Sequence, residues 1–189
     1  MKAAVESGAT FWNGADMYGT PEYNSMTLLN HYFARYPEDA DKVTVVIKGG
    51  TDLATMAPAG SSEMIRKSVD SILAQLGGNK KLDMFGLNRR DHSVPLETTL
   101  GILQKEYVDT GKIGGIALSE CSAATIHEAA RHIKVAAVEV ELSMLSRDIL
   151  TNGVAAACAE HGIPIVAYSP TGRGVSSKPF STTSRFSRY

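Results

Sequence analysis

The sequence is poor in cysteine, has no excess of charge of either sign and contains no long apolar run. Its 189 residues include two cysteines, Cys121 and Cys158, which excludes a disulfide framework and favours a reducing, cytoplasmic compartment. Nineteen Lys and Arg stand against 20 Asp and Glu, and the net charge of -1 offers no basic patch for nucleic acid. No apolar run approaches the roughly 20 residues that span a bilayer, so we expect neither nucleic acid nor a membrane as a partner.

What is present is an alternation of short β-rich runs and longer amphipathic runs. Residues 43–47 are almost continuously apolar, which is typical of a strand buried on both faces of a parallel sheet. The predicted strands are residues 10–15, 43–48, 82–88, 115–119, 137–142 and 163–168.

The amphipathic runs between these strands predict helices. Residues 61–76 carry one apolar face at helical spacing, and Gly77 ends that run. Similar stripes predict helices near 29–36 and 96–107. Ser122 and Ser146 are the expected N-caps of the next two helices. The second of these helices would carry four residues on one face: Leu150, Val154, Cys158 and His161.

This alternation predicts right-handed βαβ units and a parallel sheet. Two architectures compete, an open doubly wound sheet and a (β/α)₈ barrel. An open sheet with a dinucleotide site should carry G-x-G-x-x-G after its first strand, and the sequence has no such motif. A barrel usually has about 250 residues and eight strands, which is more than this chain offers.

Both ends of the chain depart from the pattern. Residues 1–7 resemble the last turns of a helix with no strand before them. Residues 175–189 are rich in Ser and Thr and contain basic but no acidic residues, a composition typical of a disordered tail. We therefore predict an α/β fold. Residues 1–174 would form an incomplete TIM barrel of about six of the eight βα units, truncated at both ends, and 175–189 a disordered tail.

Polar side chains follow the predicted strands, at the end of a barrel where its chemistry lies. Tyr18 comes after the first strand and Lys48 closes the second. A Lys ammonium beside a Tyr hydroxyl favours the phenolate, so such a Tyr can act as a general acid.

Six motifs, in this order and covering residues 1–174, resemble those of the aldo-keto reductase family. They are Trp12-Asn13-Gly14-Ala15-Asp16-Met17-Tyr18-Gly19, Val46-Ile47-Lys48, Asp83-Met84-Phe85-Gly86-Leu87-Asn88, Gly115-Ile116-Ala117-Leu118-Ser119-Glu120, Val138-Glu139-Val140-Glu141 and Ala167-Tyr168-Ser169-Pro170. The Trp-Asn-Gly form and the Ala-Val-Glu-Val-Glu run are most similar to the fungal pyridoxal reductase branch.

The resemblance implies an NADPH-dependent reductase of a small-molecule carbonyl substrate, an aldehyde such as pyridoxal. Tyr18 would protonate the developing alkoxide during hydride transfer, and Lys48 would add positive potential beside it. The other matches imply contacts with NADPH: Ser119 and Glu139 at the carboxamide, Tyr168 stacked on the nicotinamide, and Ser169, Thr171, Gly172 and Arg173 at the pyrophosphate.

Two of the family's four catalytic positions differ in this chain. The family's Asp, which pairs with the Lys, is Asn13, and its His is Asn88. Asn88 can donate a hydrogen bond to a carbonyl but cannot shuttle a proton. Potassium-channel β subunits resemble the chain at this Asn, so the change is compatible with reduction. Asp16 lies too close to Tyr18 to match the family's catalytic Asp, so we expect Asp16 to be a loop residue.

The alternative is an inactive truncated member of the fold, or a non-catalytic one that senses nucleotide or binds a partner. In the family, the segment after the sixth unit holds the 2′-phosphate and adenine of NADPH. The resemblance therefore implies that this chain alone binds NADPH weakly.

Several other polar residues are assigned no catalytic role. Arg89 and Asp91 are expected to form a structural ion pair, and Cys121 to be an ordinary thiol. His127 and His132 are five residues apart, which places them about 140° apart around a helix. They cannot share one ion from that helix, so no metal site is expected.

Overall fold

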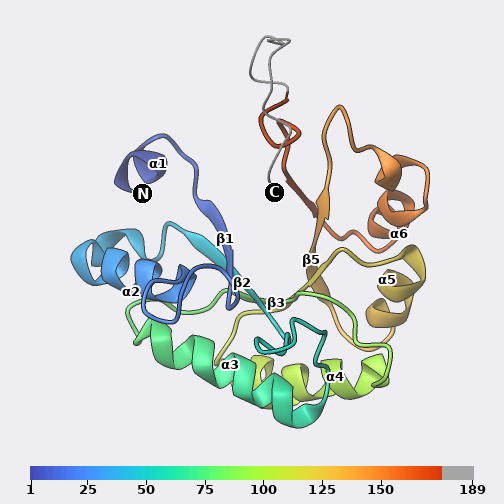
Figure 1. The fold of residues 1–189 in the computed structure, drawn as a ribbon, viewed down its shortest axis with the longest axis horizontal. Coiled ribbons are helices and arrows are strands. Elements are labelled where there is room, and N and C mark those ends of the chain that lie inside the picture. Colours follow the sequence, from blue (N-terminus) through green and yellow to red (C-terminus); the bar gives the residue numbers. More distant parts are fainter. Residues whose placement is uncertain (176–189) are drawn as a thin grey trace.

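The computed structural model describes residues 1–175, which form one sheet of six parallel strands curled into part of a barrel (Figure 1). Each strand pairs with the next one along the chain. The strands are β1 (Phe11–Ala15), β2 (Thr44–Gly49), β3 (Met84–Leu87), β4 (Ile116–Ser119), β5 (Val135–Glu141) and β6 (Ile165–Tyr168). This order confirms the incomplete barrel, because a doubly wound sheet would reverse its strand order.

One helix precedes β1, and the other helices connect successive strands and cover the outside of the curled sheet (Figure 1). They are α1 (Lys2–Glu6), α2 (Ser25–Arg35), α3 (Ser62–Leu76), α4 (Leu96–Ile102), α5 (Ala123–Ala130) and α6 (Val154–Glu160). Shorter turns add η1 (Pro37–Asp39), η2 (Leu103–Val108) and η3 (Asp148–Leu150), of which η2 is a π-helix that continues α4.

Most helix ends form where the sequence predicts them. The Ser61 side chain accepts a hydrogen bond from the Met64 amide, and Gly77 ends α3 in the left-handed conformation. Ser122 accepts from the Thr125 amide at the start of α5. These caps satisfy amides that the helices leave without an internal partner.

The last helix differs from the prediction. Ser146 caps no helix, since η3 begins after Arg147 and α6 after Gly153, and the Ser146 carbonyl accepts from the Ser143 amide in a turn. Gly153, with a φ of 89°, separates η3 from α6. Of the four residues in the predicted apolar stripe, Val154 and Cys158 are buried. The other two, Leu150 and His161, are exposed. The stripe was wrong because the chain breaks at this glycine instead of continuing one helix.

The two faces of the sheet differ because alternate residues of a strand point to opposite faces. Large apolar residues of the outer face pack in the main core with the helices, among them Val45, Ile47, Phe85, Leu118 and Val138. The inner face carries a separate cluster of small apolar residues, Val46, Ala117 and Ala137. Two positions further along each of these strands, the same inner face becomes polar, with Lys48, Ser119 and Glu139.

Within the described residues, β1 and β6 form the edges of the sheet and are its most exposed strands. Phe11 of β1 is 44% exposed, and β6 has no fully buried residue, whereas β4 is buried throughout. The predicted disordered tail lies outside the described residues, apart from Val175, and the domain boundary at 174 stays a prediction. No helix in residues 1–175 is long and apolar enough to cross a membrane.

Candidate active site

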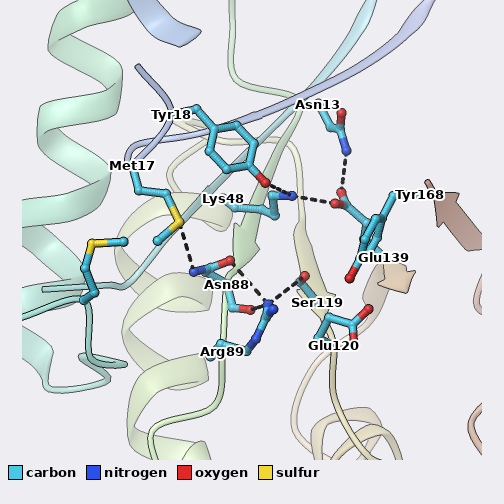
Figure 2. Close-up of a pocket in the computed structure, with 11 residues that line it drawn as sticks. Asn13, Met17, Tyr18, Lys48, Asn88, Arg89, Ser119, Glu120, Glu139 and Tyr168 are labelled. Carbon is cyan, nitrogen blue, oxygen red and sulfur yellow. Dashed lines mark hydrogen bonds and ion pairs between the residues drawn. The ribbon is translucent and has the colours of Figure 1, made fainter. Parts of the chain in front are cut away.

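The carboxyl ends of the strands surround a cavity of about 450 Å³ (Figure 2). Strand register brings polar residues together there, because Lys48 of β2 pairs with Ala15 of β1, and Ser119 of β4 pairs with Glu139 of β5. The cavity is lined by Asn13, Met17, Tyr18, Lys48, Met56, Asn88, Arg89, Ser119, Glu120, Glu139 and Tyr168. All four predicted catalytic residues are therefore at one cavity.

Lys48 is the centre of a hydrogen-bonded network in this cavity (Figure 2). Its Nζ lies 2.5 Å from Glu139 Oε1 and 3.1 Å from the Tyr18 hydroxyl. The Asn13 amide donates to the other carboxylate oxygen of Glu139 at 2.8 Å. Lys48 and Glu139 are only 6% and 5% exposed, so solvent screens this pair far less than a surface pair.

The surroundings of Lys48 keep it charged. Burial by itself lowers the pKa of Lys48, but hydrogen bonds to Glu139 and Tyr18 outweigh it, and the net pKa is raised.

Gly86 on the neighbouring strand provides space for the lysine stem, since a Cβ there would lie 2.9 Å from Lys48 Cγ. No motif in the sequence indicates this role of Gly86. Its pairing opposite Lys48 on β3 becomes visible only when the strand register is known.

The two cavity tyrosines differ in their surroundings. Tyr18 lies in the turn after β1 and is 48% exposed, so its hydroxyl is open to a ligand in the cavity. Burial and then a hydrogen bond to Glu120 raise the pKa of Tyr168 to about 12, which keeps Tyr168 protonated at neutral pH. Tyr18 is therefore the tyrosine with both a cationic neighbour and access to the cavity.

Asn88 lines the cavity, but its side-chain amide hydrogen-bonds neither Lys48 nor Tyr18. Its amide nitrogen donates to Thr51 Oγ1 at 3.0 Å and approaches Met17 Sδ at 3.6 Å. Arg89 does not pair with Asp91, so that prediction was wrong. The Arg89 guanidinium instead donates to the Asn88 carbonyl at 2.6 Å.

Asp91 has a structural role. Its carboxylate accepts from the Gly60 amide and from the Ser93 amide and hydroxyl, which fixes two loops against each other. The sequence places Arg89 and Asp91 close together. It does not show that Arg89 faces the cavity while Asp91 faces the loop that contains Gly60.

The residues predicted to contact NADPH fall into two groups. Ser119, Glu139 and Tyr168 line the cavity. Ser169, Thr171, Gly172 and Arg173 follow β6 in a tight turn, in which the Gly172 amide donates to the Ser169 carbonyl at 2.9 Å. These four residues lie outside the cavity lining, and their contacts with a cofactor stay a prediction.

Three cavity residues were assigned no role from the sequence. Met17 and Met56 come from loops, where apolar residues have no periodicity to follow. Glu120 adopts a left-handed φ of 47° and accepts from the Glu141 amide at 2.7 Å. Glu120 directly follows Ser119 at the end of β4, but the amide that its carboxylate binds belongs to β5.

Cys121 and the histidines lie away from this network. Burial raises the pKa of Cys121 to about 12, so the thiol stays protonated at neutral pH and is an ordinary one. His127 meets His161 of the neighbouring segment rather than His132, with ring nitrogens 2.9 Å apart. Glu160 lies close to this pair, but the two rings already hydrogen-bond each other on an exposed surface.

Several known proteins are similar in sequence to this chain. Residues 1–188 match the Aldo/keto reductase family. The chain is 46% identical over 176 residues to "Probable pyridoxal reductase 2" of Schizosaccharomyces pombe, covering 93% of this chain and 53% of that protein. It is 37% identical over 176 residues to an uncharacterized oxidoreductase of the same yeast, covering 93% and 52%. The chain thus spans about half the length of these curated relatives. The order of its strands, the motifs at their carboxyl ends and these matches agree that the chain belongs to the aldo/keto reductase family.

Proposed function

We propose that the chain forms the catalytic part of an NADPH-dependent oxidoreductase that reduces an aldehyde. The proposed substrate is pyridoxal, and the product is pyridoxine. The observation that carries the proposal is the Tyr18 hydroxyl, 3.1 Å from Lys48 Nζ and open to the cavity. A hydroxyl beside a fixed ammonium can release its proton to an oxygen that gains negative charge.

Each residue of the network has a distinct part in this reaction. Tyr18 donates its proton to the carbonyl oxygen of the aldehyde as that oxygen becomes an alkoxide. Lys48 stays charged and stabilises the negative charge that Tyr18 retains afterwards. Glu139 and Asn13 hold Lys48 in place, which saves reorganisation during the reaction. The Asn88 amide has two N–H donors, of which one is bound to Thr51 and the other faces only the weak acceptor Met17 Sδ, so the second can donate to the substrate.

The cavity fits the nicotinamide end of the cofactor. The buried hydroxyl of Ser119 suits the carboxamide of the nicotinamide. The half-buried ring of Tyr168, whose hydroxyl stays protonated, suits stacking against the flat nicotinamide ring. Ser169, Thr171, Gly172 and Arg173 would hold the pyrophosphate. When bound, NADPH supplies the hydride.

The relative named a pyridoxal reductase, at 46% identity, supports pyridoxal as the aldehyde. Met17 and Met56 give the cavity two apolar walls against which a flat pyridine ring could pack. Two free cysteines are consistent with a cytoplasmic protein. The partner is then a small molecule, and the oligomeric state is left open.

A second candidate function is binding of the nucleotide without turnover. The engagement of Asn88 with Thr51 and Met17 favours it, because that amide is turned toward protein atoms. Such a chain would sense the cofactor or bind a partner.

The test is consumption of NADPH by the purified chain with pyridoxal, followed by absorbance and by detection of pyridoxine. We expect slow turnover that Tyr18→Phe abolishes, together with weak binding of NADPH by fluorescence titration. Binding without pyridoxine formation would support the second function. Absence of both, in a chain shown by circular dichroism to be folded, would overturn the proposal.

A further inference from the structure

The buried lysine of the cavity is neutralised from an unexpected side of the barrel. The family resemblance assigns the counter-ion of Lys48 to the first strand, where this chain has the neutral Asn13. In the structure the carboxylate comes from β5, across the cavity, and Glu139 Oε1 lies 2.5 Å from Lys48 Nζ. A residue that the resemblance gives to the cofactor therefore pairs with the catalytic lysine.

We propose that Glu139 is the positioning residue of Lys48. The exchange is one of position: the anion beside Lys48 stands on β5, where the family resemblance would put it on β1, and β1 has the neutral Asn13 instead. Glu139 sets the charge and location of the ammonium that acts on Tyr18. The inference deepens the proposed function and rests on it for its consequence in turnover, but its electrostatic part can be measured without cofactor.

The contacts of Asn13 support the exchange. Its amide nitrogen donates to Glu139 Oε2 at 2.8 Å, so one carboxylate oxygen faces the amide and the other faces Lys48. An Asp at position 13 beside Glu139 would place two carboxylates in contact, and like charges this close disfavour each other. Conversely, Asn13 beside a Gln would leave the buried ammonium with no anion in contact. Asn at one position therefore requires an acidic residue at the other.

The remaining charged groups around the cavity do not replace Glu139. Glu120, after β4, accepts from the Glu141 amide and from the Tyr168 hydroxyl. Arg89, after β3, donates to the Asn88 carbonyl and has the same charge as Lys48. Asp16, after β1, directs its carboxylate to Ser68.

Removal of the Glu139 charge has one direction of effect. Burial by itself lowers the pKa of Lys48, and the hydrogen bond to Glu139 is the first of the contacts that raise it. Glu139→Gln therefore lets the ammonium lose its proton at lower pH. Because turnover needs Lys48 charged, the alkaline limb of the pH profile of NADPH oxidation moves to lower pH in the same variant.

The experiment measures the titration of Lys48 by NMR, from its Cε resonance in protein with isotope-labelled lysine, assigned with Lys48→Arg. In Glu139→Gln we expect the midpoint to fall by roughly one pH unit or more. The double variant Asn13→Asp/Glu139→Gln returns the carboxylate to β1 and should restore most of the shift. Glu106→Gln, which breaks the exposed Arg66–Glu106 pair, is the matched control and should leave Lys48 unchanged.

A second variant covers poor folding of Glu139→Gln. Glu139→Asp keeps the charge but withdraws it by one methylene, so a smaller fall in the same direction is expected. The inference is overturned if Glu139→Gln or Glu139→Asp folds and its Lys48 titrates at the same pH as in Glu106→Gln. This holds whether or not the chain oxidises NADPH. A shifted titration with no turnover in any variant would uphold the role of Glu139 and count against the proposed reductase.

Discussion

Two tyrosines of this protein lie beside buried charges of opposite sign. In α2, the Tyr32 hydroxyl donates to Asp39 at 2.7 Å, and Lys2 and Lys42 also donate to that carboxylate. At the cavity, the Tyr18 hydroxyl is 3.1 Å from Lys48, which Glu139 neutralises. Both clusters contain a buried charge, a counter-charge and a phenol, and the residues of the second cluster line the cavity described above.

The sign of the buried charge decides what each tyrosine can do. Burial and the bond to the Asp39 anion raise the pKa of Tyr32 to about 12, so its proton is held and the contact is structural. Hydrogen bonds from Lys2, Lys42 and Tyr32 hold the pKa of Asp39 well below its usual range. Tyr18 instead lies beside the Lys48 ammonium, 3.1 Å from it, and is 48% exposed, so its hydroxyl faces a cation and is open to the cavity.

The largest expected effect comes from removing each hydroxyl in turn. Tyr18→Phe should lower NADPH-dependent reduction of pyridoxal by about 10²–10⁴-fold and leave the melting temperature unchanged. Tyr32→Phe, the matched variant, should lower the melting temperature and leave the rate per folded molecule unchanged. Equal loss of activity in the two folded variants would remove the distinction between a catalytic and a structural tyrosine.

Next in size is the stability of the Lys48–Glu139 pair. Lys48→Met leaves the Glu139 carboxylate buried without its cation, and we expect the free energy of unfolding to fall by roughly 3 kcal/mol. The double variant Lys48→Met/Glu139→Gln removes both charges and should recover much of that loss. Urea unfolding of the wild type, both single variants and the double variant measures the coupling. Additive losses would show that the pair is not coupled.

The Asp39 cluster predicts a pH-dependent contribution to stability. Because the pKa of Asp39 is lowered in the folded state, its contribution is present above the ordinary Asp pKa of about 3.9 and is lost as the pH falls below it. Asp39→Asn should lower the melting temperature by several degrees near neutral pH, and this difference should shrink in acid. The exposed neighbour Asp41→Asn is the control. A difference that stays constant with pH would contradict the role of the ionised carboxylate.

The smallest effect is expected at Asp16. Burial raises its pKa, and its Oδ1 has no hydrogen-bond partner among the described residues. A raised pKa means that the ionised group lowers stability as the pH rises through the folded pKa. Asp16→Asn should therefore raise the melting temperature slightly near neutral pH and leave it unchanged in strong acid. A lower melting temperature at neutral pH would show that the charge has a stabilising partner.

The sequence predicted the strands well because strand periodicity is a property of neighbouring residues. All six predicted strands form, with ends shifted by a few residues, and Tyr18 and Lys48 meet as expected. The last helix was predicted too early, since the break at Gly153 interrupts an apolar stripe that looks continuous. Arg89 and Asp91 share a loop but do not pair, and Asp91 accepts from Gly60, 31 residues away, a contact that no local pattern could assign.

The sequence by itself determined that the chain is a partial βα barrel with a lysine and a tyrosine at the carboxyl ends of its strands, because alternation and strand periodicity are properties of neighbouring residues. Only the tertiary structure decided which anion neutralises that lysine. Glu139 and Lys48 are 91 residues apart, and their contact depends on how far the sheet curls and on which strands face each other. Curvature and register of this kind brought the carboxylate of β5 to the lysine of β2.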